Sequence, residues 1–210
     1  MSNIEKEIAL SLLKIKAVKL SPKEPFTWAS GWNSPIYCDN RIILSHPEIR
    51  KQIYQSFAQL VKEKYPQVEL IAGVATGAIA HGVLVAEEMG LPFIYVRSAP
   101  KGHGLGNQIE GQYTSGQKVV VIEDLISTGS SSLSAVETLR NADLDVLGMV
   151  AIFTYEFKKA ADNFLAANVQ LNTLSCYSSL ITEALQSGLV KNEDLADLKE
   201  WRKSPDTWKK

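Results

Sequence analysis

VVVIEDLISTGSS, residues 119–131, is the stretch of this sequence that decides the fold. Its four β-branched residues predict a buried parallel strand, and the carboxylates Glu123 and Asp124 follow where that strand is expected to end. A loop of small residues comes next, and then a helix begins. Backbone N–H groups of such a loop and the positive end of the helix dipole converge on one point, which suits a phosphate dianion.

Strands and helices alternate on both sides of this stretch. Short apolar runs predict strands at residues 68–74, 92–96, 118–122, 147–153 and 169–174. Apolar residues at helical spacing predict helices at 4–15, 47–65, 78–89 and 133–139, with further helical segments between and after the last two strands. Ser45 to Glu48 matches a capping box for the second helix, and Gly90 is expected to end the third. The alternation predicts an α/β fold with a mostly parallel, doubly wound sheet flanked by helices.

Residues 20–40 differ from the rest of the chain, because they hold three Pro, two Trp and several small polar residues. We expect short strands and turns there, forming a small flap packed on the body. The 210 residues are expected to form a single domain, 1–210. Its parts would be an N-terminal helix and flap over about 1–45, an α/β core over about 46–175 and C-terminal helices over about 176–210. The final segment, WRKSPDTWKK, would either fray or dock through Trp201 and Trp208.

Composition narrows the class of protein. The 22 Lys and Arg residues balance 23 Asp and Glu residues, which argues against a dedicated nucleic-acid or membrane surface. No apolar run is long enough for a membrane span, and the N-terminus does not resemble a signal peptide. Cys38 and Cys176 lie far apart and are expected to be small buried hydrophobes in a reducing compartment. These features predict a cytoplasmic protein.

Two adjacent carboxylates beside a phosphate-binding turn are unfavourable for binding an anion alone. They make sense where the ligand also offers hydroxyl donors or a divalent cation, and a sugar phosphate with Mg²⁺ supplies both. The alternative is a helix-capping turn with a solvated acidic pair. Neither a Walker loop nor a dinucleotide-binding glycine fingerprint is present in the sequence.

Residues 97–117 are Gly-rich and polar, and they lack core-forming periodicity. Loops of this length are uncommon in compact domains unless they act as lids, although a surface insertion is the alternative. Arg97, Lys101 and His103 in this loop suit a leaving group with several negative charges. His46 and His81 are expected to be structural, so a dedicated zinc site is not predicted.

The 119–131 stretch resembles the phosphoribosyl-pyrophosphate (PRPP) motif of type I phosphoribosyltransferases. Three further stretches resemble orotate phosphoribosyltransferases: YVRSAPKGHG at 95–104 resembles their catalytic loop, FTWASG at 26–31 their base-site segment and AGVATG at 72–77 their pyrophosphate loop. The resemblance runs in order over about residues 8–175. It implies a type I phosphoribosyltransferase fold in which the N-terminal flap is a hood over the base site.

The resemblance also implies roles for individual residues. Glu123 and Asp124 would hydrogen-bond the ribose hydroxyls, and Lys101, His103 and Asp124 would be catalytic. Ser127 would also reach orotate. The PRPP-binding residues would be Arg97, Lys101, His103, Glu123, Asp124, Leu125, Ile126, Ser127, Thr128, Gly129, Ser130 and Ser131. Mg²⁺ would be bound mainly through PRPP rather than at a protein metal site, and the chain would form a homodimer with shared active sites.

Some positions depart from the family pattern. Ser98, Ala29 and Gly77 stand where relatives often carry Lys, and Tyr155 stands near the position of an Arg that contacts the orotate carboxylate. How that carboxylate is held is therefore open, with Lys19 and Arg41 as candidates. Trp28, Trp32 and Tyr37 would either stack on a base or pack in the core.

The resemblance predicts transfer of ribose 5-phosphate from PRPP to N1 of orotate. Two alternatives remain at this stage. One is a phosphoribosyltransferase for another base, and the other is a PRPP-sensing regulator without catalytic activity.

Overall fold

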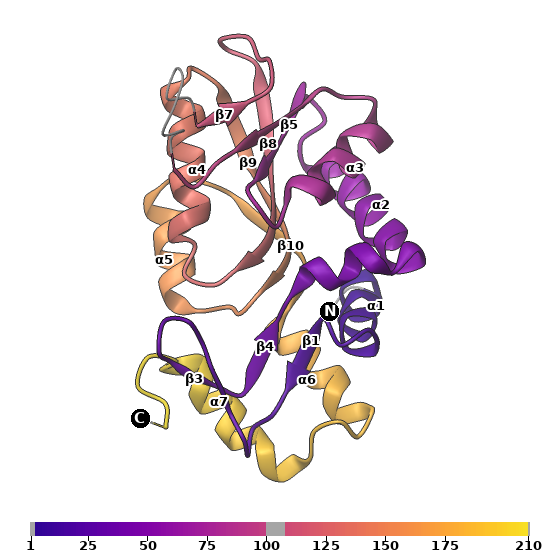
Figure 1. Ribbon diagram of the computed structural model, residues 1–210, viewed down its shortest axis with the longest axis vertical. Coiled ribbons are helices and arrows are strands. Elements are labelled where there is room, and N and C mark those ends of the chain that lie inside the picture. The colour runs from indigo at the N-terminus through magenta and orange to yellow at the C-terminus, as the bar shows by residue number, and fades with distance from the viewer. Residues whose placement is uncertain (1–2, 100–107, 210) are drawn as a thin grey trace.

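The computed structural model describes residues 3–99 and 108–209. Its centre is a sheet in the order β10–β9–β8–β5–β6–β7 (Figure 1). The bounds are β5 (Leu70–Val74), β6 (Phe93–Val96), β7 (Ile109–Glu110), β8 (Lys118–Ile126), β9 (Asp145–Thr154) and β10 (Leu171–Cys176). All neighbours are parallel except β6 and β7, so the predicted mostly parallel α/β sheet is confirmed.

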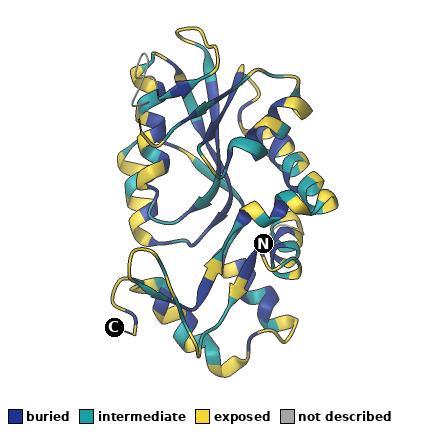
Figure 2. Ribbon diagram, in the orientation of Figure 1, coloured by how far each residue is buried: buried dark blue, intermediate teal, exposed yellow. Residues whose placement is uncertain are grey.

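Helices cover both faces of this sheet. Their bounds are α1 (Asn3–Lys14), α2 (Pro47–Lys64), α3 (Ile79–Met89), α4 (Ser130–Asn141), α5 (Lys158–Ala166), α6 (Tyr177–Gln186) and α7 (Leu195–Lys203), with 3-10 turns η1 (Asn40–Ser45) and η2 (Asn192–Asp194). Figure 1 shows α4 and α5 on one face and α1, α2 and α3 on the other. The strands between them are buried, whereas the outer faces of the helices are exposed (Figure 2).

Strand alternation divides the core into two layers. Val119 and Val121 of β8 pack in the cluster on the α4 side, whereas Val120 and Ile122 pack in the cluster on the α3 side. Successive residues of a strand point to opposite faces of the sheet. Glu123 and Asp124, which follow Ile122 in β8, therefore also point to opposite faces.

The hood, defined here as residues 18–38, consists of two small antiparallel ladders. β1 (Val18–Leu20) pairs with β4 (Ile36–Cys38), and β2 (Phe26–Thr27) pairs with β3 (Asn33–Ser34). It lies beside α6 and α7 at one end of the sheet (Figure 1). Trp201 and Trp208 are 0% and 5% exposed, so the C-terminal segment docks rather than frays.

Several details differ from the sequence predictions. β8 extends to Ile126, because it pairs with β9 as far as Thr154, and so Glu123 and Asp124 lie within the strand rather than after it. Ile109 and Glu110 form a strand that the Gly-rich character of the loop does not indicate. The capping box at Ser45 is wrong: Ser45 belongs to η1, and His46 occupies the N-cap of α2 without a side-chain hydrogen bond.

Other local predictions are confirmed. Pro47 begins α2, and Gly90 ends α3 with a positive φ of 66°. Cys38 and Cys176 are free thiols, but both are half-buried rather than fully buried. Burial nevertheless raises the pKa of the Cys38 thiol and raises that of Cys176 to about 11. No helix within 3–99 or 108–209 is long and apolar enough to cross a membrane.

Candidate active site

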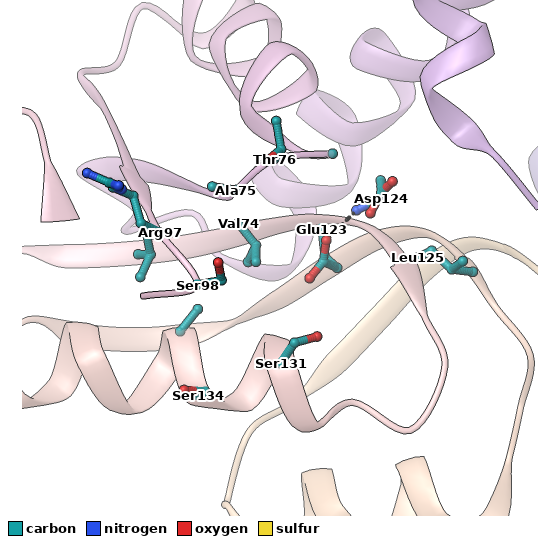
Figure 3. A pocket seen from close by; sticks show the side chains of 13 residues that line it. Val74, Ala75, Thr76, Arg97, Ser98, Glu123, Asp124, Leu125, Ser131 and Ser134 are labelled. Atoms are coloured by element: carbon teal, nitrogen blue, oxygen red, sulfur yellow. Dashed lines mark hydrogen bonds between the residues drawn. The ribbon is translucent and has the colours of Figure 1, made fainter. Parts of the chain in front are cut away.

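A cavity of about 310 Å³ opens at the carboxyl ends of three neighbouring strands (Figure 3). Residues 74–77 follow β5, residues 96–98 follow β6 and residues 123–125 belong to β8, with Ser131 of α4 completing the wall. Ligands of open α/β sheets bind at this edge. Figure 3 shows Arg97 at one end of the cavity and the two acids at the other.

The two acids point to opposite faces of β8 (Figure 3). Glu123 turns toward α4, where its Oε2 accepts a hydrogen bond of 2.8 Å from the Ser132 hydroxyl and its Oε1 accepts one of 2.9 Å from the Asp124 N–H. The Glu123 side chain is nearly buried, with the residue 5% exposed. The pKa of Glu123 is raised to about 8, mainly by burial and secondly by the charge of Asp124. The neutral form of Glu123 is therefore favoured at neutral pH.

Asp124 turns toward α3 and the loop before it. A Cβ at Gly77 would overlap the Asp124 carboxylate, so only glycine leaves the space that this side chain occupies. The last pair of β5 with β8 joins Gly73 to Ile122, and beyond it β8 has no strand on that side among the described residues. Asn40 fills part of this gap, because its Nδ2 donates a hydrogen bond of 2.6 Å to the backbone oxygen of Asp124.

Residues 127–129 form the turn between β8 and α4. Gly129 has a φ of 78° and occupies the N-cap of α4, and the Phe164 ring lies where its Cβ would be. Asn163 Nδ2 donates to the Thr128 backbone oxygen at 2.9 Å and so fixes the turn from outside. A helix N-terminus of this kind, rich in hydroxyl groups, suits a phosphate. Ile126 is 0% exposed, backbone included, and it does not line the cavity.

A second cavity of about 380 Å³ lies on the other side of Leu125, which lines both. Its walls are formed by Thr27, Trp28, Ala29, Tyr37, Cys38, Leu125, Ser127 and Tyr155. Three of these eight lining residues are aromatic, and none of the eight is Asp, Glu, Lys, Arg or His. Trp28 and Tyr37 therefore face a cavity, whereas Trp32 stacks on Trp28 with ring centroids 6.5 Å apart. A planar ligand in this cavity would meet a sugar in the first one next to Leu125.

The two candidate cations for a carboxylate differ in their surroundings. Arg41 is engaged by Asp39, with its Nε 2.6 Å and its Nη2 2.9 Å from the two carboxylate oxygens, and this contact lowers the pKa of Asp39. Lys19 is exposed and lies opposite Tyr37 in the β1–β4 register, so both side chains lie on one face of that ladder. Neither Lys19 nor Arg41 lines the second cavity.

The predicted loop residues are described only in part. Arg97 N–H donates to the Gln108 backbone oxygen at 2.8 Å, and the Arg97 side chain lies 3.4 Å from Glu110, so the two ends of the loop meet. Lys101 and His103 lie outside the described residues. Ser98 is exposed and lines the first cavity beside Arg97.

Two buried residues that contact the acid pair, Asn40 of η1 and Ser132 of α4, have no signal in the sequence. His81 of α3 is also buried and lies close enough to Asp124 for their charges to interact. Neither ring nitrogen of His81 makes a hydrogen bond to a described residue, and burial lowers its pKa, which fits the expected structural role. The described residues contain no group of three or more His, Cys, Asp or Glu that could hold a metal ion.

Comparisons with known proteins agree with this geometry. The family model for the phosphoribosyl transferase domain matches residues 39–186. The orotate phosphoribosyltransferase of Cytophaga hutchinsonii is 57% identical over 99% of this chain and 100% of that protein. That of Porphyromonas gingivalis is 56% identical over 99% of both chains. The crystal structure of orotate phosphoribosyltransferase from Aeropyrum pernix matches with a TM-score of 0.76 and 26% identity, over 88% of this chain and 99% of that one.

Proposed function

The chain belongs to the orotate phosphoribosyltransferases of the phosphoribosyl transferase family, and we propose from this premise how its two cavities carry out the transfer. Ribose 5-phosphate passes from PRPP to N1 of orotate, giving orotidine 5′-monophosphate and pyrophosphate, a step of pyrimidine biosynthesis. The observation that carries the assignment is the junction at Leu125 of a polar cavity holding an acid pair and an aromatic cavity.

The sugar phosphate is assigned to the first cavity. Residues 127–131 hold the 5′-phosphate, supported by the glycine N-cap at Gly129 and the hydroxyl groups of the turn. Asp124 accepts hydrogen bonds from the ribose hydroxyls. Glu123 shares that role, and its raised pKa also lets its protonated form donate a hydrogen bond to a sugar oxygen of bound PRPP.

Orotate is assigned to the second cavity. Its ring lies between the aromatic walls formed by Trp28, Tyr37 and Tyr155, and Ser127 at the floor reaches its polar edge. None of the residues that line the cavity is cationic, so Lys19, which shares a face with Tyr37, is the candidate for the orotate carboxylate. Arg41 is less suited, because Asp39 already holds its guanidinium.

In the reaction, the bond from C1′ of PRPP to the pyrophosphate oxygen breaks while the bond from C1′ to N1 of anionic orotate forms. Positive charge develops on the ribose ring and negative charge on the departing pyrophosphate. Catalysis is therefore mainly positioning and electrostatic stabilisation. Arg97, Lys101 and His103 stabilise the pyrophosphate, and Lys101 or His103 donates a proton to it.

Mg²⁺ fits the first cavity as an ion carried in by PRPP. The cavity offers the side chains of two adjacent acids, Glu123 and Asp124. When bound, Mg²⁺ would supply positive charge that offsets the negative charge of the pyrophosphate. Glu123 and Asp124 are the residues that would face it.

Two further proposals concern the whole protein. We propose a homodimer in which the loop that carries Lys101 and His103 reaches the partner's site, supported by the resemblance of residues 95–104 to the catalytic loop of orotate phosphoribosyltransferases. We also propose a cytoplasmic location, supported by the two free thiols Cys38 and Cys176. Light scattering and mixing of two inactive variants, one altered in the loop and one at Asp124, test the dimer through recovery of activity.

The function is tested by an absorbance assay with PRPP and Mg²⁺, in which orotate, uracil, adenine and hypoxanthine are offered separately. Turnover of orotate alone is expected. Preferential turnover of another base would contradict the assignment, and tight salt-sensitive binding of RNA or DNA without turnover would favour a regulator.

A further inference from the structure

Trp201 lies at the centre of an aromatic cluster behind the second cavity. Its ring centroid is 5.7 Å from that of Trp28 and 5.6 Å from that of Tyr155, and it meets both rings nearly at right angles. Trp28 and Tyr155 in turn contact each other at 5.1 Å, and both line the cavity. Trp201 thus touches two walls of the cavity without facing it.

Packing holds Trp201 in place. Its side chain is fully buried, and its indole N–H makes no hydrogen bond within the part of the chain that the structure describes. Phe157 and Tyr177 enclose its other sides at 5.2 and 5.3 Å. The Tyr177 hydroxyl donates to the Leu198 backbone oxygen at 3.0 Å and fixes α7 against α6. Close-packed interiors have low compressibility, so a substitution at Trp201 is expected to shift the Trp28 and Tyr155 side chains that line the cavity.

The same C-terminal segment binds the hood at the surface. Lys209 Nζ donates to the Pro22 backbone oxygen at 3.0 Å, and Asn33 Nδ2 donates to the Lys209 backbone oxygen at 2.6 Å. Lys23 forms an ion pair of 2.8 Å with Glu193 of η2. Trp28, which sits on Trp201, is also held by a hydrogen bond of 3.1 Å from its indole N–H to the Ile36 backbone oxygen.

We propose that Trp201 is a positioning residue for base recognition, setting the separation of the Trp28 and Tyr155 walls and thereby the fit of a flat pyrimidine. The inference rests on the proposed function, which supplies the base. It concerns segments outside the family match at 39–186, because Trp28 precedes that range and Trp201 follows it. The chain therefore uses its own C-terminal helix to shape the base site.

The experiment compares Trp201→Phe and Trp201→Leu with the unchanged protein in steady-state kinetics. We expect the KM for orotate to rise about 3-fold for Phe and about 10-fold or more for Leu, as for a misplaced binding group. The KM for PRPP should stay within about twofold, because none of the four aromatic rings that contact Trp201 lines the first cavity. The preference for orotate over uracil should fall in the same order.

Phe57→Leu is the matched control, since Phe57 of α2 is equally buried and does not line either cavity. It should lower the Tm without changing the ratio of the KM for orotate to the KM for PRPP.

Two other variants test the proposal if Trp201→Leu does not fold. They are Trp201→Phe and the surface double variant Asn33→Ala with Lys209→Ala, and both should raise the ratio of the KM for orotate to the KM for PRPP. If the Trp201 variants leave the KM for orotate unchanged, or change both KM values equally, this inference is overturned while the proposed function stands. Absence of orotate turnover in the unchanged protein would overturn the proposed function and this inference with it.

Discussion

Asn40 and Asp124 are 84 positions apart in the sequence, and one hydrogen bond of 2.6 Å joins the Asn40 side chain to the Asp124 backbone oxygen. Asn40 is 1% exposed, so no bulk water can replace this bond. The contact fixes the peptide of Asp124, to which we assign the ribose hydroxyls, and it ties η1, directly after the hood, to the central sheet.

Asn40→Ala is expected to lower the free energy of unfolding by about 1–3 kcal/mol, because the Asp124 carbonyl is left without a partner. The KM for PRPP should rise, because the Asp124 carboxylate moves with its peptide. Urea denaturation and steady-state kinetics measure the two effects. Asn141→Ala, at the exposed end of α4, is the control, and an unchanged KM for PRPP would contradict the positioning role.

Glu123→Gln is expected to remove a pH dependence of stability. The folded protein keeps the Glu123 proton up to about pH 8, whereas the unfolded chain releases it near 4.5. The native state thus binds more protons in this window, so stability is highest below it and is lost as the pH rises through it. The Tm of the unchanged protein should fall relative to that of Glu123→Gln between pH 5 and 8, by about 2–4 °C per kcal/mol. Parallel Tm curves would exclude the raised pKa.

Gly77→Ala is expected to impair the reaction more than the fold. The added methyl group overlaps the Asp124 carboxylate, so either that side chain or the loop before α3 must move. We expect kcat/KM for PRPP to fall about 10- to 100-fold, since small misplacements of binding groups have effects of this size. Circular dichroism should show an unchanged fold. Wild-type kcat/KM would mean that the Asp124 position is not critical.

Asp124→Asn keeps the volume of the side chain and removes its charge. We expect kcat/KM for PRPP to fall about 10- to 100-fold, because hydrogen bonds from the ribose hydroxyls to an ionised acceptor are lost. The pKa of Glu123 should fall at the same time, since the Asp124 charge contributes to raising it. The Tm profile with pH checks this second effect, and an unaltered profile would contradict the coupling of the two acids.

Lys101→Ala is expected to lower kcat by about 10²–10⁴-fold if Lys101 serves as an acid or a charge clamp for pyrophosphate. The measurement is turnover at saturating PRPP, with Lys191→Ala at the exposed N-cap of η2 as the control for loss of one lysine. Near-normal turnover of Lys101→Ala would remove the residue from the mechanism.

Local sequence patterns predict most of the framework. Short apolar runs predict the strands and helical spacing predicts the helices, and the Gly90 and Pro47 positions mark helix ends that the structure confirms. The end of β8 could not be read this way, because Glu123 and Asp124 look like the residues of a turn. Pairing with β9 keeps them in the strand, so tertiary contacts override local composition there.

The supporting residues of the candidate site were not predictable. Asn40, Ser132 and Trp201 carry no motif, and their partners lie far away in the sequence or depend on which face of a strand points where. At Ser45 the sequence carries a capping motif that the structure does not use. Ser45 is the last residue of the 3-10 turn η1 and does not cap α2. Motifs identify the groups that touch the ligand, whereas the groups that orient them follow only from the packed fold.

β5 is five residues long and β8 is nine, and the acid pair lies on the part of β8 that outlasts its neighbour. The proposed sugar site therefore lies where the middle of the sheet lacks main-chain pairing. Lengthening β5 by two or three residues would close this opening with backbone hydrogen bonds, so the short length of β5 is what leaves room for a ligand there.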